Sequence, residues 1–157
     1  MRETADMAVE GQKLVFTRMR ARHLAVVLEL ERLSYPEPWT LGMYRMELEN
    51  PTSHLFVALL NGDIAGYAGF WLVIDEAHVT RVTIAEEWRG CGHGRSLMEF
   101  LLGQASDLGA ILARLEVRES NVPARRMYEG LGFVTEGRRI GYYQRTNENA
   151  VLMCRRF

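Results

Sequence analysis

Cysteine is scarce in this chain of 157 residues, and long apolar runs are missing. Its only cysteines are Cys91 and Cys154, too few for a disulfide framework, which favours a reducing compartment. No stretch reaches the roughly 18 uncharged apolar residues that cross a bilayer, and residues 1–13 lack the apolar segment typical of a secretion signal. The four histidines and the cysteines show no paired ligand spacing, so we expect no metal. The sequence predicts a soluble cytoplasmic protein that does not associate with membranes.

Neither sign of charge is in large excess over the whole chain. The net charge of -1 at pH 7 excludes a globally basic nucleic-acid binder. Residues 1–109 hold 15 acidic against 10 basic side chains, whereas residues 110–157 hold nine arginines against five glutamates. A basic C-terminal third suits an anionic cofactor and an acidic remainder suits a cationic partner. Scattered surface charge explains the same numbers equally well.

The pattern of apolar residues predicts one domain at 14–157 behind a tail at 1–13. Strands are expected at 14–17, 54–60, 63–74, 78–85 and 111–117, with two more before the C terminus. Helices are expected around 24–30, at 40–49, from the glycine loop to Gly109 with Leu97, Leu101, Ala105 and Leu108 on one face, and from Asn121 to Gly132. Asn61-Gly62 predicts a hairpin turn, and Asn121 with Pro123 predicts a helix start. The order favours a mixed α/β fold over a purely parallel sheet.

A glycine-rich loop, Arg89-Gly-Cys-Gly-His-Gly94, lies between a strand and a helix N-terminus. Such a junction binds anions, because free N–H groups and the helix dipole meet there and glycine lets a phosphate approach the backbone. The Walker A pattern fails for lack of Gly-Lys-Ser/Thr, and the dinucleotide fingerprint needs a glycine where Arg95 stands. The pattern Arg/Gln-x-x-Gly-x-Gly/Ala is met by Arg89, Gly92 and Gly94. A loop that only turns the chain remains an alternative.

The C-terminal half carries further ordered motifs: LEVRESNVPARRMYEGLGF, GRRIGYY and ENAVLM. With the glycine loop, they make residues 79–153 resemble the GCN5-related N-acetyltransferase (GNAT) superfamily, more narrowly its branch that acetylates the N-terminal alanine of a ribosomal protein. The N-terminal half resembles the family only loosely, mainly through Pro38-Trp39. The resemblance implies acetyl-CoA as donor and a GNAT fold, with a central mixed, largely antiparallel sheet flanked by about four helices.

The resemblance also implies roles for individual residues. Glu116 would be the general base, and Tyr128 the general acid that protonates the leaving thiolate. Cofactor contacts would come from three places. The pantetheine-binding strand would contribute Val82, Thr83 and Ile84, and the start of the last helix would contribute Asn121. The pyrophosphate loop would contribute Arg89, Gly90, Cys91, Gly92, His93, Gly94 and Arg95.

Local chemistry is compatible with these two catalytic roles. Glu116 interrupts an apolar strand in which Leu115 and Val117 point to the opposite face. A surface glutamate paired with Arg114 or Arg118 is the alternative interpretation. Tyr128 lies about two helical turns after Asn121 and on nearly the same side. Without the motif, a half-buried aromatic that anchors the helix would be the simpler interpretation of Tyr128.

Amine chemistry favours a protein N-terminus as acceptor, since only a neutral amine attacks a thioester. About a tenth of an α-amino group is neutral at pH 7, against about one lysine in 2,500. The resemblance implies the alanine N-terminus of a small-subunit ribosomal protein. Trp39, Tyr142 and Tyr143 are candidates for the acceptor groove, and an aromatic core explains them equally well.

Two departures from the family pattern bear on the acceptor. The acidic ED-A element reads Glu148-Asn149-Ala150, and the segment SYPEPWT differs from the usual form.

Two other functions stay open: a GNAT enzyme that acetylates a small-molecule amine or a lysine, and a binding module for CoA or another nucleotide without chemistry. Cys91 invites a nucleophile interpretation, although the family transfers the acetyl group directly. Oligomeric state stays open.

Overall fold

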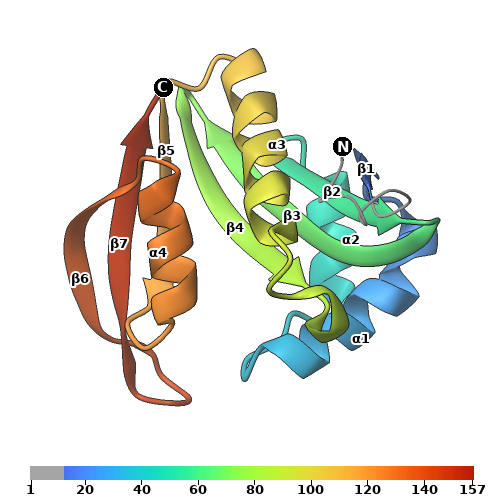
Figure 1. The fold of residues 1–157 in the computed structure, drawn as a ribbon, viewed down its shortest axis with the longest axis horizontal. Helices are drawn as coiled ribbons and strands as arrows, with labels where there is room; N and C mark the ends of the chain where they lie inside the picture. Colours follow the sequence, from blue (N-terminus) through green and yellow to red (C-terminus); the bar gives the residue numbers. More distant parts are fainter. Residues whose placement is uncertain (1–12) are drawn as a thin grey trace.

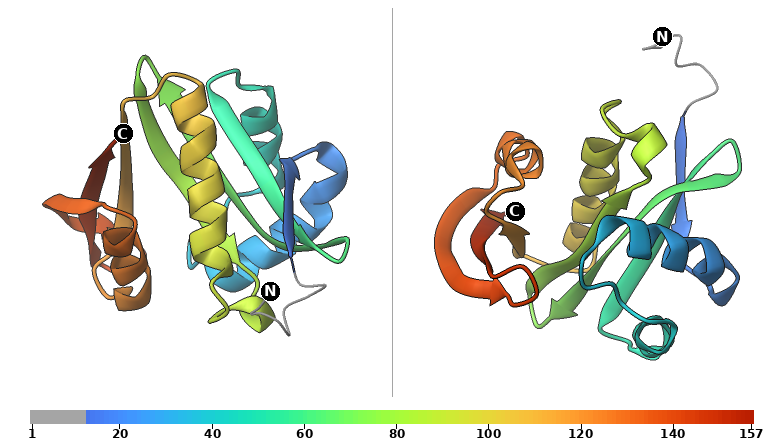
Figure 2. Two further views of the ribbon diagram at one scale, coloured as in Figure 1. Left: turned by 45° about the horizontal axis from the view of Figure 1, so that its top comes forward. Right: turned by 90° about the horizontal axis from the view of Figure 1, so that it is seen from below.

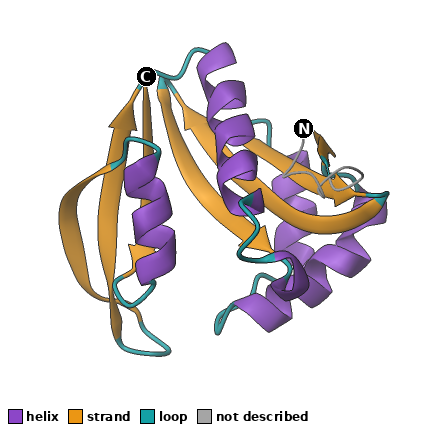
Figure 3. Ribbon diagram, viewed as in Figure 1, coloured by secondary structure: helices purple, strands orange, loops and turns teal. Residues whose placement is uncertain are grey.

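Seven strands form one sheet in the order β1-β2-β3-β4-β5-β7-β6 in the computed structural model, which describes residues 13–157 (Figures 1 and 3). The strands are β1 (Leu14–Arg18), β2 (Ser53–Leu60), β3 (Asp63–Val73), β4 (Glu76–Ile84), β5 (Leu112–Arg118), β6 (Val134–Tyr143) and β7 (Glu148–Arg156). The α-helices are α1 (Leu24–Ser34), α2 (Leu41–Glu49), α3 (His93–Asp107) and α4 (Val122–Gly130). Every neighbouring pair of strands is antiparallel except β4 and β5. The predicted mixed, largely antiparallel sheet with about four helices is confirmed, whereas the predicted tail lies outside the described residues apart from Lys13.

Helices cover both faces of the sheet, with α1 and α2 on one side and α3 and α4 on the other (Figure 2, right). Side chains alternate between the two faces along a strand. Leu55 and Val57 of β2 therefore pack with Val27 of α1, while Phe56 and Ala58 belong to the larger cluster that holds the apolar side of α3. Burial on both faces explains why β2 and β3 are apolar almost throughout.

The turn and the helix cap that the sequence predicts are found at the expected residues. Asn61 and Gly62 both adopt positive φ, +53° and +87°, and join β2 to β3. The side chain of Asn121 caps α4 by accepting a hydrogen bond from the Ala124 N–H at 3.3 Å. Gly109, at φ +101°, follows the end of α3. Leu108 differs from expectation: it lies beyond the last helical residue and is exposed instead of facing the core.

The parallel strands β4 and β5 separate soon after they meet. They pair only over Glu76–His78 of β4 and Leu112–Arg114 of β5, and Figure 1 shows them diverging from that end. One extra residue of β4, Thr80, bulges where Val79 and Arg81 pair with Phe70 and Gly69 of β3, and such a bulge increases local bend and twist. The sheet is therefore split at its centre, with β4 held by β3 and β5 held by β7.

Candidate active site

A cavity of about 400 Å³ lies where β4 and β5 separate. Its walls come from the end of α1, the segment that joins α1 to α2, and β3, β4, β5, α4 and β6. Four of the residues predicted from the sequence to form the site line it, namely Val82, Glu116, Asn121 and Tyr128. Trp39, Tyr142 and Tyr143, the candidates for an acceptor groove, line the same cavity. Residues from six helices and strands thus meet at the split in the sheet.

The backbone of β4 has an open edge on the side of this cavity, at Val82 and the adjoining Ile84. The Ala85 N–H bonds the Ala65 carbonyl, so Thr83 and Ala85 face β3 and the intervening Val82 and Ile84 face away from it. The Val82 carbonyl accepts a bond from the Tyr35 hydroxyl at 3.0 Å, and the Ile84 carbonyl accepts one from Arg89 Nε at 2.7 Å. Within residues 13–157, no strand pairs with β4 at these two positions on the β5 side. Their N–H groups can therefore bind the amide carbonyls of an extended ligand.

Glu116 points into the cavity from β5 and meets a histidine of β4. Its Oε1 lies 2.9 Å from Nε2 of His78, and its side chain is about one-fifth exposed. The alternative partners do not reach it, since Arg114 pairs with Glu76 and Glu136 and Arg118 pairs with Glu148. Glu116 therefore combines access to the cavity with a titratable partner.

His78 is a site residue that sequence reasoning missed. It stands 38 positions before Glu116, and only the parallel pairing of β4 with β5 brings the two together. The hydrogen bond to Glu116 raises the pKa of His78, against the opposing effects of burial and of Arg114. The one available signal was a histidine within a strand that leads to the glycine loop.

Tyr128 reaches the cavity from α4, opposite β4. The residue is buried, 7% exposed, and its ring packs against Phe133 with centroids 5.7 Å apart. Burial raises the pKa of its phenol, and the neighbouring Tyr35 and Tyr143 add to that effect. Tyr128 consequently keeps its proton at neutral pH, as a proton donor must.

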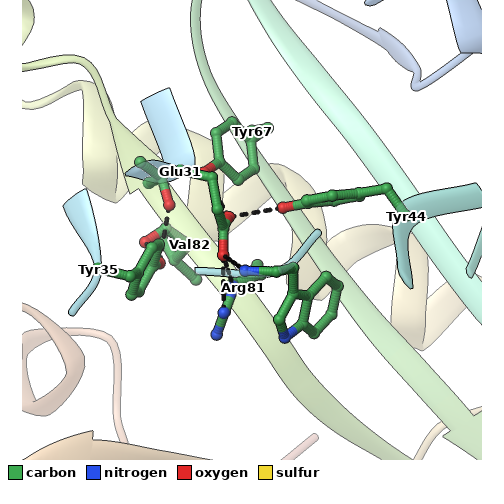
Figure 4. Close-up of polar contacts among 8 residues, drawn as sticks. Glu31, Tyr35, Tyr44, Tyr67, Arg81 and Val82 are labelled. Atoms are coloured by element: carbon green, nitrogen blue, oxygen red, sulfur yellow. Dashed lines mark hydrogen bonds and ion pairs between the residues drawn. The ribbon is translucent and has the colours of Figure 1, made fainter. Parts of the chain in front are cut away.

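A fully buried carboxylate, Glu31 of α1, organises the wall of the cavity (Figure 4). Oε1 accepts bonds from the hydroxyls of Tyr44 and Tyr67, each at 2.7 Å. Oε2 accepts bonds from the Trp39 backbone N–H at 2.8 Å and from Nε and Nη2 of Arg81 at 3.0 and 2.7 Å. A buried charge is tolerated when it is paired and hydrogen-bonded in this way. Glu31 thereby ties α1, α2, β3 and β4 together.

Arg81, which is bonded to Glu31, holds two aromatic rings of the cavity wall in place. Its guanidinium lies between two rings, 4.2 Å from the centroid of Tyr35 and 4.4 Å from that of Trp39. The hydroxyl of Tyr35 in turn contacts Thr83 Oγ1 at 2.7 Å as well as the Val82 carbonyl. The proline-rich segment between α1 and α2 is therefore fixed against β4, beside the backbone groups that a ligand would use.

The glycine loop opens α3 with the geometry of an anion site. Gly90 and Gly92 have φ of +78° and +84°, a region that favours glycine. Gly92 precedes the first helical residue, and Ser96 is the first to bond back, to the Gly92 carbonyl at 3.1 Å. The amides of the first turn, from His93 to Arg95, therefore lack intrahelical acceptors and can bind a pyrophosphate.

Three side chains of this loop have their own surroundings. Besides its bond to Ile84, Arg89 donates from Nη2 to Ser34 Oγ at 3.3 Å, which links the loop to α1. The His93 ring is buried against Trp88, and burial lowers its pKa, so only its backbone is available to a ligand. Cys91 is exposed and free.

The end of the cavity beside Trp39 and Tyr143 is bordered by two loops in contact. The Arg145 N–H bonds a carboxylate oxygen of Glu37 at 2.9 Å, and Arg145 Nη1 bonds the Pro36 carbonyl at 3.0 Å. Asn149, where the family pattern has an acid, bonds the Gly141 N–H at 2.9 Å and Glu119 at 3.1 Å. This departure thus stabilises the β6–β7 hairpin that forms the border.

No group of three potential metal ligands occurs within residues 13–157. Among the helices of that range, none is long and apolar enough to cross a membrane.

Comparison with known proteins agrees with this geometry. The family model described as "Acetyltransferase (GNAT) family" matches residues 24–133. A protein of Bacillus subtilis, provisionally named a ribosomal protein bS18-alanine N-acetyltransferase, is 36% identical over 142 residues, which cover 90% of this chain and 94% of that protein. The ribosomal protein bS18-alanine N-acetyltransferase of Haemophilus influenzae is 32% identical, covering 89% and 97%. The crystal structure of the Escherichia coli ribosomal-protein-S18-alanine N-acetyltransferase superimposes with a TM-score of 0.84 at 26% identity, covering 92% and 94%.

The substitution Glu31→Gln tests the buried carboxylate. It preserves shape but leaves the charge of Arg81 unpaired, and breaking a buried ion pair costs about 3–5 kcal/mol. We expect urea denaturation to show a loss of unfolding free energy of that size. Glu29→Gln, an exposed position on the same helix, is the matched control and should change it by less than about 0.5 kcal/mol. Equal, small effects of the two substitutions would contradict the role of Glu31.

Proposed function

The chain belongs to the acetyltransferase (GNAT) family and is an N-acetyltransferase that uses acetyl-CoA; from this premise we propose that its acceptor is the N-terminal amine of a protein. Two observations support the proposal. One is the cavity at the split between β4 and β5, where the carboxylate of Glu116 and the phenol of Tyr128 face one space. The other is the similarity over about nine-tenths of the chain to relatives named for acetylating the alanine of bS18.

The donor fits the open edge of β4, the glycine loop and the start of α4. The N–H groups of Val82 and Ile84 would bind the pantetheine, and the amides from His93 to Arg95 would bind the pyrophosphate. Among the pantetheine candidates, the backbone of Thr83 faces β3, so the flanking residues carry this role. Asn121 lines the same cavity at the start of α4 and would contact the donor there. Bound acetyl-CoA supplies an activated acyl carbon beside the incoming amine.

The chain's own groups would move the protons. Glu116 would accept a proton from the attacking amine, directly or through a water. Tyr128 would donate its proton to the sulfur as the carbon–sulfur bond breaks. An α-amino group needs little help, because its pKa of about 7.7–8 leaves a useful neutral fraction at physiological pH. A single carboxylate therefore suits an N-terminal amine better than a lysine.

We infer that the acceptor is, more specifically, an N-terminal alanine such as that of ribosomal protein bS18. The Trp39 and Tyr143 end of the cavity would receive the first residues of the chain, between the Pro36–Glu37 segment and the turn that carries Arg145. Because that entrance is bordered on both sides, a chain terminus enters more easily than a side chain in the middle of a folded surface. A cytoplasmic location stays a prediction.

Mass spectrometry on synthetic peptides tests the acceptor. The purified protein is mixed with acetyl-CoA and a peptide that begins with alanine, in the sequence of the host's bS18 N-terminus. We expect one acetyl group on the α-amine. A peptide with the same sequence and a blocked N-terminus, but with an internal lysine, should stay unmodified. Acetylation of the lysine, or of neither peptide while acetyl-CoA binds, would reject an N-terminal acceptor.

Paired substitutions test the two proton-transfer residues. Glu116→Gln should lower kcat about 100-fold or more, because general-base assistance contributes on this scale. Tyr128→Phe should lower kcat while the fold is retained, since phenylalanine keeps the ring contact with Phe133. Calorimetry should give both variants the wild-type affinity for acetyl-CoA. An unchanged kcat in either variant would remove that residue from the mechanism.

A further inference from the structure

The pair formed by His78 and Glu116 is held more rigidly than a contact between two surface side chains. His78 lies at the last position where β4 and β5 pair, opposite Arg114, and on its other side it pairs with Trp71 of β3. The indole of Trp71 packs edge-on against the imidazole, with centroids 5.9 Å apart. Trp71 is itself fixed, because its Nε1 donates to Glu47 of α2 at 2.8 Å. The imidazole therefore has a defined place beside the carboxylate.

The charged groups around His78 leave Glu116 as its main electrostatic partner. Arg114 of β5 acts against protonation of His78, but it is paired with Glu76 of β4 and Glu136 of β6. On the β3 side the neighbour is the uncharged Trp71.

Burial raises the pKa of the Tyr143 phenol, on β6, to about 12, and the negative charge of Glu116 also raises it. Tyr143 is thus uncharged at neutral pH, and a proton that arrives at Glu116 has His78 as its nearest basic acceptor.

We propose that His78 is a positioning residue for Glu116 and accepts the proton that Glu116 removes from the amine. The proposal rests on Glu116 being the base of the proposed function. As the carbon–nitrogen bond forms and the carbon–sulfur bond breaks, the amine proton passes to Glu116 and then from Oε1 to Nε2 of His78, whose neutral form accepts it as the tautomer with its proton on Nδ1. Glu116 is left ionised and His78 cationic. The phenolic proton goes to the thiolate, so a proton from solvent restores Tyr128, and His78 releases its own to solvent.

Burial and acidity both fit this role. The His78 side chain is 39% exposed, against 19% for Glu116, so the imidazole is the member of the pair with the better access to solvent. Imidazole has an ordinary pKa of about 6.5 and a glutamate one of about 4.3, which makes imidazole the better match for an amine near 7.7–8. Transfer from the carboxyl to the imidazole is downhill, and His78 must be neutral to receive the proton.

The test is the pH dependence of kcat for His78→Gln against the wild type. Glutamine places an amide near Nε2 and keeps a hydrogen bond to Glu116 but cannot titrate. With one amine acceptor for both proteins, ionisation of the acceptor cancels in the kcat ratio. We expect the wild type to be at least tenfold faster at pH 8, with the ratio falling toward one as pH drops below 6.5. His54→Gln, on β2 and outside the cavity, should keep the wild-type profile.

A ratio that is the same at every pH would overturn the proposal, since a residue that only holds Glu116 lowers kcat uniformly. A ratio of one throughout would remove His78 from the reaction. The assay uses whichever amine the wild type acetylates, so failure on N-terminal peptides alone rejects the proposed acceptor and leaves this test intact. NMR titration gives a reading without turnover: we expect the His78 pKa above 6.5 in the wild type and lower in Glu116→Gln. Titration at or below 6.5 in the wild type would also overturn the proposal.

Discussion

The structure depends on one interruption of hydrogen bonding, the separation of β4 from β5 after three residue pairs. A continuous ladder would satisfy the backbone of both strands and leave no space at the centre of the sheet. Because the ladder stops, Val82 directs polar backbone groups into a cavity lined by Glu116 and Tyr128, and Ile84 continues the same open edge of β4. Each half of the sheet stays ordered, since β3 and β7 still pair with the outer sides of the two strands. The site is thus a gap in a rigid framework.

The side chains of β4 connect this gap to the rest of the molecule. Arg81 joins the strand to the buried carboxylate of Glu31, and three residues earlier His78 joins it to Glu116. A buried ion pair gives little net stability, because desolvation offsets most of the attraction. Its benefit here is positional: it sets the Tyr35 and Trp39 rings against the cavity. One strand therefore places the wall of the cavity, the donor contacts and the partner of the base.

The features predictable from the sequence are those with local causes. Asn61-Gly62 needs only its own backbone preferences to turn a hairpin, and Asn121 needs only the first turn of α4 to act as its cap. The presence of Glu116 and Tyr128 in one cavity followed from an ordered family motif, which contains long-range information that periodicity does not. Roles on the reacting groups remain predictions.

The features that the sequence did not reveal depend on pairing between distant segments. Glu31 and Arg81 are 50 positions apart and His78 and Glu116 are 38 apart, and strand register cannot be computed from either segment alone. One signal was present: Glu31 follows Val27 by four positions, so a charge falls on the apolar face of α1. A charged residue at such a position indicates a buried partner, although not which one.

Residue-resolved hydrogen exchange tests the central claim, that the open edge of β4 is the binding surface for the donor. The amides of Val82 and Ile84 should exchange much more slowly once coenzyme A saturates the protein, while those of Val57 and Tyr67, which lie in strands paired on both sides within the sheet, should not change. Slowed exchange at those two positions is the result that the account predicts. Saturating coenzyme A with exchange at Val82 and Ile84 unaltered would contradict it.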